Sequence, residues 1–291
     1  MSMSIASKRA TFKQLHEAGC FVIPNPWDVG SARWLQGLGF KALASTSSGF
    51  AWSRGHPDNG ITLTQALDHL AELVAATDVP INADFESGFA ADADAVEASV
   101  RLAVATGVAG LSIEDSTGDP ARPLFSMEEA TARLQAARRA IDSAGGDTLL
   151  VGRAECFLVG QPDIGETIRR LQAYAQAGAD CLYAPGIRSP AHISAVVAAV
   201  APKPVNLLVS APGDLTVAEI AALGVRRISV GGAMARAAWG GFMRSARLLA
   251  EQGRFDGFVD AASGKDLNAF FAADCKSSPA TPTAFTGRRC P

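Results

Sequence analysis

The sequence predicts an α/β protein, specifically a (β/α)8 or TIM barrel, from three observations. Eight short apolar runs rich in Val, Ile and Leu alternate along the chain with stretches of helical period. Each run is apolar throughout, which is typical of a parallel strand buried on both faces. Eight strand–helix units are the number that closes a barrel. The expected strands span residues 21–23, 42–45, 81–84, 110–113, 149–152, 181–183, 205–209 and 228–230.

The stretches between these runs have the pattern of amphipathic helices, apolar at i, i+3 and i+4 with charged residues opposite. Ser126 followed by Glu128 and Glu129 predicts an N-cap with acids in the first turn. Gly107 and Gly178 each predict the end of a helix just before a strand. An opening helix is expected to cover the bottom of the barrel. The expected helices span residues 4–18, 64–76, 94–105, 127–144, 162–177, 190–200 and 216–223.

A doubly wound open sheet is the alternative architecture. Such a sheet usually has five or six strands and a glycine-rich phosphate turn after the first strand. The first turn here, from Asn25 to Asp28, has no G-x-G-x-x-G pattern. We therefore expect a single barrel domain over residues 1–265, with an N-terminal capping helix. A C-terminal extension follows over residues 266–291, and its polar end from residue 277 is expected to be a loose tail.

Composition narrows the class of protein. The 291 residues are 48% hydrophobic and 19% charged, with 26 basic and 29 acidic side chains and a net charge of −3. This balance gives no basic patch for nucleic acid, and no apolar run is long enough to span a membrane. The five cysteines show no C-x-x-C spacing, which argues for a reducing compartment and against a zinc site. We expect a soluble, cytoplasmic protein with a small-molecule substrate, no nucleic acid and no membrane partner.

Acidic residues follow several of the expected strands. Asp84 and Glu86 end the third strand, Glu114 ends the fourth, and Asp58 lies in the loop after the second. The carboxyl ends of the strands meet at the active-site mouth of such a barrel. Clustered carboxylates without His or Cys favour Mg²⁺ or Mn²⁺, so Asp84, Glu86 and Glu114 are candidate metal ligands. The alternative is that these acids cap helices or pair with arginines on the rim.

Arg153 ends the fifth strand and is expected to be deeply placed. A guanidinium in a barrel mouth is suited to hold a carboxylate or phosphate in a bidentate manner. The alternative is an ion pair with Glu155 or Glu114.

Further candidates for substrate binding lie at other strand ends. The segment Thr46, Ser47 and Ser48 is rich in small residues whose N–H groups could hold a carboxylate, although a plain turn has the same composition. Trp27 is a candidate wall of the pocket, with core packing as the alternative. Asn206, inside the seventh strand, is the last candidate.

The histidines divide into two groups. His16, His69 and His192 fall in or at the start of expected helices, which favours surface positions. His56 lies two residues before Asp58, where a role in the site and a loop hydrogen bond are equally good interpretations.

One ordered set of motifs resembles a known family. The segments NPWDVGSARW, STSSGFAWSRGHPD, NADFESGF, GLSIEDS, LVGRAE and AGADCLYAPG are similar to the isocitrate lyase/phosphoenolpyruvate mutase superfamily. The resemblance covers residues 21–257, and the order of the motifs at consecutive strand ends makes the combination specific.

The resemblance implies a fold, a cofactor and a reaction type. Family members are (β/α)8 barrels whose last helix is swapped between neighbours in homodimers or homotetramers. They bind Mg²⁺ or Mn²⁺ with a 2-oxo acid and pass through a metal-stabilised enolate. By this resemblance the metal residues are Asp84, Glu86 and Glu114, the substrate carboxylate is held by Thr46, Ser47 and Ser48, and Arg153, Asp58 and Glu114 take part in catalysis.

Two departures from the family pattern bear on the substrate. The lyases that cleave isocitrate or methylisocitrate carry a K-K-C-G-H loop, whereas residues 116–123 here contain no Cys, Lys or His. The sixth strand is followed by Pro185 where the family often has a glutamate. The first departure argues against a true isocitrate or methylisocitrate lyase. The second removes a ligand or substrate contact, so the substrate is expected to lack the matching group.

The leading functional hypothesis is a Mg²⁺-dependent enzyme that cleaves a C–C bond of a 2-oxo acid, as an oxaloacetate decarboxylase or related carboxylic-acid lyase does. One alternative is a P–C bond enzyme, either a phosphoenolpyruvate or carboxyphosphonoenolpyruvate phosphonomutase or a phosphonopyruvate hydrolase. The other is a barrel that binds an oxo acid without turnover.

Overall fold

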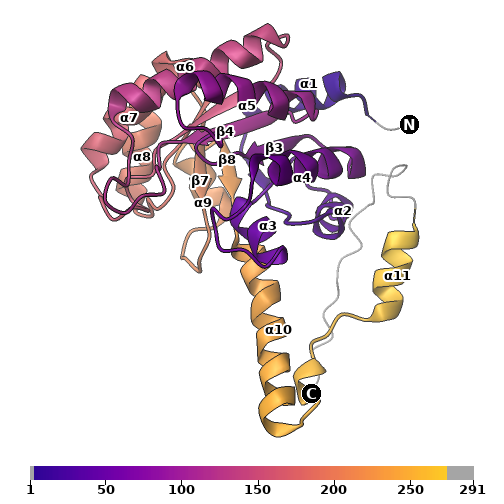
Figure 1. Ribbon diagram of the computed structural model, residues 1–291. Coiled ribbons are helices and arrows are strands. Elements are labelled where there is room, and N and C mark those ends of the chain that lie inside the picture. Colours follow the sequence, from indigo (N-terminus) through magenta and orange to yellow (C-terminus); the bar gives the residue numbers. More distant parts are fainter. Residues whose placement is uncertain (1–2, 274–291) are drawn as a thin grey trace.

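The computed structural model describes residues 3–273 and shows eight parallel strands in one nearly closed barrel (Figure 1). The order around the sheet is β1-β8-β7-β6-β5-β4-β3-β2, so from β2 to β8 each strand pairs with its neighbour in sequence, and β1 pairs with β8. The predicted (β/α)8 fold is therefore confirmed. The strands are β1 (Phe21–Ile23), β2 (Leu43–Ala44), β3 (Ile81–Asp84), β4 (Gly110–Glu114), β5 (Leu149–Arg153), β6 (Cys181–Tyr183), β7 (Val205–Leu208) and β8 (Arg227–Ser229).

Helices surround the strands, and their apolar faces form one large core with the outer face of the sheet. Capping boxes begin several of them; in α6, for example, Ser126 and Glu129 satisfy each other's backbone N–H groups. The expected helices are present, and α2, α3, α10 and α11 are additional. The helices are α1 (Ile5–Glu17), α2 (Val29–Gly37), α3 (Ser47–Ser53), α4 (Leu63–Ala76), α5 (Ala93–Ala105), α6 (Met127–Ser143), α7 (Ile164–Gln176), α8 (Pro190–Val200), α9 (Val217–Ala222), α10 (Ala233–Gln252) and α11 (Gly264–Ala272), with a 3-10 turn η1 (Asp256–Phe258).

The barrel is closed between β1 and β2 by a few specific hydrogen bonds. Ala44 N donates to Pro24 O at 3.0 Å across this seam. The buried Asn25 side chain donates to Ser45 O at 3.0 Å, and its Oδ1 accepts from Val230 N and Gly231 N at 2.9 Å each. One amide group thus ties together the ends of β1, β2 and β8.

Helix α1 closes the bottom of the barrel, as expected. Phe12 is fully buried there, and a Cβ added to Gly110 would lie 2.6 Å from its ring, so only glycine fits beneath β4. His16 is also buried and its Nδ1 lies 2.8 Å from Phe12 O. His69 is buried against Phe50, with ring centroids 3.9 Å apart.

The surface positions expected for His16 and His69 are therefore wrong. Burial is the main cause that lowers the pKa of His16 to about 3 and that of His69 to about 4. Both rings are consequently neutral at physiological pH and pack as core residues.

The C-terminal segment leaves the barrel. Helix α10 projects away from the strands, and α11 lies near α2 (Figure 1). The rings of Trp34 and Phe270 are 4.6 Å apart, and Arg33 donates to Phe271 O at 3.3 Å. Helix α11 crosses the expected boundary at residue 265, and the expected tail from residue 277 lies outside the described residues. Within residues 3–273 no helix has the length and apolar character needed to cross a membrane.

The seam at Asn25 predicts a strong effect on stability. Asn25→Ala leaves two backbone N–H groups and one carbonyl unpaired, so we expect the free energy of unfolding to fall by about 2–4 kcal/mol. Urea unfolding followed by circular dichroism measures this change. Asn268→Ala, at an exposed position of α11, is the matched control and is expected to change stability by less than about 0.5 kcal/mol. An equal effect of the two variants would contradict the assignment.

Candidate active site

The carboxyl ends of the strands surround a cavity of about 370 Å³. Its wall is strongly polar, and it brings together side chains from loops and strands that are far apart in the sequence. Among the predicted site residues, it is lined by Thr46, Ser47, Ser48, Asp58, Asp84 and Arg153.

Arg153 lies at the centre of this site. Its Nη1 is 3.1 Å from Asp84 Oδ1 and 3.1 Å from Glu114 Oε2, and its Nε donates to Glu155 Oε1. Its carbon Cζ lies 5.1 Å from the centre of the Tyr183 ring. The side chain is 15% exposed and lines the cavity. The ion pairing expected as the alternative is present, and the guanidinium also faces the cavity, so binding of a substrate carboxylate or phosphate stays a prediction.

Asp84 connects β3 to the start of α3. Its Oδ2 accepts hydrogen bonds from Ser47 N at 3.0 Å and Ser47 Oγ at 2.9 Å. Thr46 is the N-cap of α3, and its Oγ1 lies 3.1 Å from Ser48 Oγ. The predicted substrate-binding segment is therefore the first turn of a short helix. Because Asp84 accepts the N–H of Ser47, that group is occupied in this structure.

Glu86 has a conformation that the sequence did not indicate. Its φ angle of 48° lies in the left-handed region, and β3 ends at Asp84. Glu86 therefore does not continue the extended strand, although the sequence placed both acids at the end of the third strand. Its Oε1 is buried and has no hydrogen-bond partner among the described residues. Burial, followed by the charges of Asp84 and Asp58, raises the pKa of Glu86 to about 8.

The other acids of the site share this environment. The pKa values of Glu114, Glu155 and Asp58 are raised, mainly by burial. The positive charge of Arg153 acts in the opposite direction and lowers the pKa of each of these groups. The guanidinium of Arg153 thus faces five carboxyl groups, which either retain protons or need a further cation. These belong to Asp58, Asp84, Glu86, Glu114 and Glu155.

These residues fit a divalent ion that keeps water ligands. Within residues 3–273, no three His, Cys, Asp or Glu side chains are already placed to hold a metal ion directly. Mg²⁺ commonly binds through one or two carboxylates and several waters. The unpartnered Oε1 of Glu86, beside Asp84 and Glu114, offers an acceptor of this kind.

A second layer of residues fixes the ends of β4 and β5. Asp115 is 2% exposed, and its Oδ1 accepts from Glu155 N at 2.8 Å. Its Oδ2 accepts from Tyr174 Oη at 2.6 Å and from Arg170 Nη1 at 3.0 Å. Asp115 therefore orients the segment that carries Arg153 and Glu155, and it is fully used as a structural acceptor.

Two predicted substrate-binding residues do not line the cavity. Trp27 packs behind α3. It lies so close to Gly49 of that helix that a Cβ atom added to the glycine would be 3.0 Å from the Cβ of Trp27. Asn206 is completely buried inside β7, where it donates to Ser229 Oγ at 2.9 Å and accepts from Arg227 Nε at 2.8 Å.

Arg227 and Arg236 line the cavity although the sequence gave no reason to single them out. Strand β8 begins at Arg227, one residue earlier than expected, which places this arginine in the barrel wall. The only sequence feature that could have indicated Arg227 is its position directly before the apolar run at residues 228–230. His56 lines a separate surface hollow with Trp52 and Trp239, outside this cavity.

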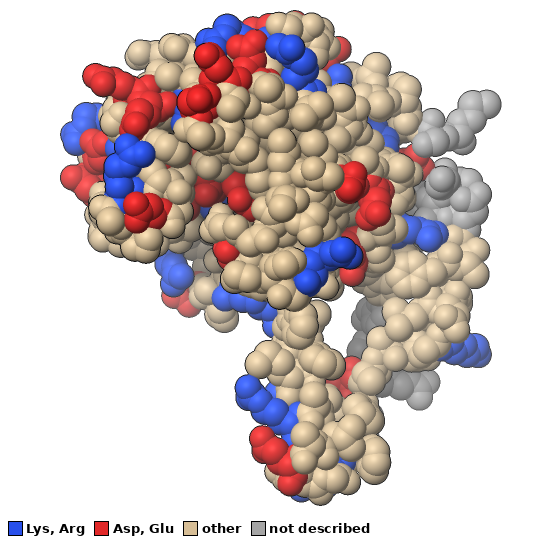
Figure 2. Space-filling view, viewed as in Figure 1, with Lys and Arg blue, Asp and Glu red and all other residues tan. Residues whose placement is uncertain are grey.

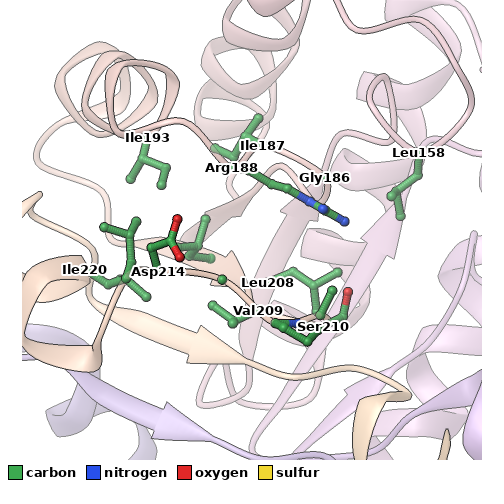
Figure 3. Close-up of a pocket in the computed structure, with 15 residues that line it drawn as sticks. Leu158, Gly186, Ile187, Arg188, Ile193, Leu208, Val209, Ser210, Asp214 and Ile220 are labelled. Atoms are coloured by element: carbon green, nitrogen blue, oxygen red, sulfur yellow. The ribbon is translucent and has the colours of Figure 1, made fainter.

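A smaller pocket of about 130 Å³ lies between the loops that follow β6 and β7 (Figure 3). It shares Leu158, Leu208 and Ser210 with the main cavity. Arg188 extends toward the side where Leu208 and Ser210 lie, and Asp214 lies beside Ile220 (Figure 3). The remaining wall is largely apolar, and the carboxylate cluster is not part of it.

Comparisons with known proteins agree with this architecture. The model of the phosphoenolpyruvate phosphomutase family matches residues 12–250 of the chain. Among solved structures, a proposed lyase/mutase from Burkholderia cenocepacia J2315 is similar with a TM-score of 0.91 and 45% identity, over 94% of this chain and 99% of that one.

Two further relatives have named activities. The chain is 31% identical over 205 residues to an oxaloacetate decarboxylase of Bradyrhizobium diazoefficiens, which covers 68% of this chain and 69% of that protein. Oxaloacetate acetylhydrolase in complex with the product oxalate is similar with a TM-score of 0.82 and 27% identity, over 92% and 95% of the two chains. The chain therefore belongs to the phosphoenolpyruvate phosphomutase family, within the phosphoenolpyruvate mutase/isocitrate lyase superfamily of enzymes.

Proposed function

We propose that the protein is a Mg²⁺-dependent enzyme that cleaves a C–C bond of a 2-oxo acid, as an oxaloacetate decarboxylase or related carboxylic-acid lyase. The observation that carries this proposal is the site around Arg153. A single guanidinium is surrounded by buried acids, and Glu86 retains an unpartnered oxygen beside them. Such a site suits a small anionic substrate together with a divalent cation.

The ion would be held by Asp84, Glu86 and Glu114, largely through water. When bound, Mg²⁺ (or Mn²⁺) would polarise the oxo group of the substrate and stabilise the negative charge that develops when the adjacent bond breaks. The carboxylate pKa values support this role, because a cation favours the ionised forms that burial now disfavours.

The chain's own residues would bind the substrate and manage protons. Arg153 lines the cavity and would pair with a carboxylate of the substrate, exchanging part of its contact with Asp84 and Glu114. Thr46, Ser47 and Ser48 would supply hydroxyl and N–H donors to the substrate, with Ser47 exchanging its two hydrogen bonds to Asp84. Asp58 lines the cavity, and burial and Asp84 raise its pKa, so it is the candidate group for proton transfer.

The choice of C–C over P–C chemistry rests on relatives and on one loop. Oxaloacetate decarboxylase and oxaloacetate acetylhydrolase are both among the similar proteins. Residues 116–123 lack the Cys, Lys and His of the isocitrate-cleaving loop, which favours a smaller oxo acid. A phosphonomutase or phosphonopyruvate hydrolase remains the enzymatic alternative, and the family model itself is named for a phosphomutase.

We further propose that the chain assembles as a homodimer or homotetramer through α10. This helix leaves the barrel, and residues 237–243 along it include no charged residue, in keeping with the largely uncharged stretch of the projection in Figure 2. Trp239, Phe242, Met243 and Leu249 are between 39% and 62% exposed along it. An apolar face of this kind is typical of a surface that is covered by another subunit.

Purified protein with Mg²⁺ tests the reaction. With oxaloacetate and phosphonopyruvate as separate substrates, we expect release of pyruvate from oxaloacetate and no phosphate from phosphonopyruvate. Glu86→Ala is expected to lower kcat/KM by about a hundredfold or more, because the carboxylate next to the ion is lost. Glu72→Ala, on the exposed face of α4, is the matched control and should retain wild-type activity.

The other outcomes decide between the alternatives. Turnover of phosphonopyruvate alone would replace the C–C proposal by the P–C alternative. Binding of an oxo acid with no turnover of either substrate would indicate a barrel without catalytic activity. Because spontaneous decarboxylation of oxaloacetate also yields pyruvate, the rate above the enzyme-free background is the relevant measurement.

The pKa of Glu86 predicts a pH dependence of stability in the metal-free protein. Between the ordinary value of 4.5 and the raised value of about 8, the folded chain keeps a proton that the unfolded chain releases. Stability contributed by this group therefore falls as pH rises through that window. Glu86→Gln cannot titrate, so its free energy of unfolding should increase relative to wild type between about pH 5 and 8.

Urea titrations in EDTA across this range measure the difference. Glu72→Gln, at an exposed position, is expected to show a difference from wild type that does not change with pH. A difference for Glu86→Gln that is equally independent of pH would show that the carboxyl is already ionised in the folded protein.

A further inference from the structure

Arg227 is a buried cation on the floor of the main cavity. It is 2% exposed at the start of β8. Its Nε donates to Asn206 Oδ1 at 2.8 Å and its Nη1 to Asn82 Oδ1 at 3.3 Å. Both partners are neutral amide oxygens, and within residues 3–273 no carboxylate forms an ion pair with this guanidinium. A buried charge without a counter-ion is costly to maintain.

The other buried arginines show how such a charge is usually satisfied in this protein. Arg153 and Arg170 form ion pairs with two or more acids each. Arg133 has no ion pair, but it donates to three backbone carbonyls and lies over the Phe125 ring at 4.2 Å, away from the cavity. Arg227 differs from all three, because it lines the cavity and, among the described residues, has two side-chain amides as its partners instead of an acid. Its Nη2 makes no hydrogen bond to a described residue.

The floor and the mouth belong to the same cavity. Asn82 lies two residues before Asp84 on β3, which places it about 6.6 Å deeper along the strand. The guanidinium of Arg227 contacts Asn82, whereas that of Arg153 contacts Asp84. Ser112 and Ser229 line the space with polar groups where barrels usually carry branched apolar side chains. The two guanidiniums therefore border one cavity at different depths.

We propose that Arg227 binds the far carboxylate of a 2-oxo dicarboxylic acid whose oxo-acid end lies at Arg153. The inference rests on the proposed function for the orientation of the substrate. Nη2 would donate to the carboxylate, and the amide oxygens of Asn82 and Asn206 would keep the guanidinium in place. The subsite would select dicarboxylates over oxo acids with an apolar end, because an apolar group there would leave the buried charge unpaired.

Calorimetric binding to the purified chain with Mg²⁺ tests the subsite. The probes are 2-oxoglutarate and 2-oxopentanoate, which have the same chain length and differ in whether the far end is a carboxylate or a methyl group. We expect wild type to bind 2-oxoglutarate about tenfold tighter or more. Arg227→Gln should reduce the preference to about twofold or less, and Arg227→Lys, which keeps the charge, should retain part of it.

Arg226→Gln is the matched control. It removes the same charge from the adjacent residue, whose side chain donates to Gly19 O and does not line the cavity, so the preference should persist. Equal affinity of wild type for the two probes, no binding of 2-oxoglutarate, or a preference that survives in Arg227→Gln would each overturn the subsite. Thermal unfolding checks that the variants are folded, and the comparison of probes on wild type does not depend on any variant.

Binding is measured without turnover, so the two proposals can fail separately. A dicarboxylate preference that depends on Arg227, in a protein that turns over no oxo acid, would support the subsite and remove the proposed reaction. Pyruvate production from oxaloacetate without any dicarboxylate preference would support the proposed reaction and overturn the subsite.

Discussion

The guanidinium of Arg153 is the interaction on which the site depends. It is the cation that holds Asp84, Glu114 and Glu155 together at the mouth of the barrel. Without it, several buried carboxylates would repel one another at short range. With it, five carboxyl groups still surround one guanidinium, so they either retain protons or are completed by a divalent ion. The same guanidinium faces the cavity, so the group that holds these acids together is also available to a substrate carboxylate.

The surrounding fold keeps this arrangement rigid by means of polar groups inside the barrel. Asp115 orients the segment that carries Arg153 by accepting hydrogen bonds from the backbone after β5 and from two side chains of α7. Asn25 closes the seam between β1 and β2 at the same end of the barrel. The polar interior has a second consequence, because it extends the cavity down to Arg227. A barrel with an apolar centre would confine binding to the mouth, whereas this one offers charge at two depths.

The fold could be predicted from the sequence because both of its signals are local. Buried parallel strands are apolar throughout, and helices show their period and their caps, so element boundaries agree within a few residues. The cluster of Asp84, Glu114 and Arg153 could also be predicted, because the ends of parallel strands meet at one edge. The left-handed backbone of Glu86 and the contact of Ser47 with Asp84 could not, since they depend on tertiary packing. Arg227 was not predicted, because site residues are expected at the carboxyl ends of the strands and Arg227 lies at the start of β8.

Binding of a divalent ion by the acids around Arg153 is tested most directly by a metal titration. EDTA-treated protein is titrated with Mn²⁺ in the presence and absence of oxalate, and the free ion is followed by electron paramagnetic resonance. We expect one Mn²⁺ per chain, bound more tightly with oxalate, and a loss of affinity of about tenfold or more in Asp84→Asn. No uptake of Mn²⁺ by the wild-type chain, or uptake that is unchanged in Asp84→Asn, would contradict a divalent-ion site at this cluster.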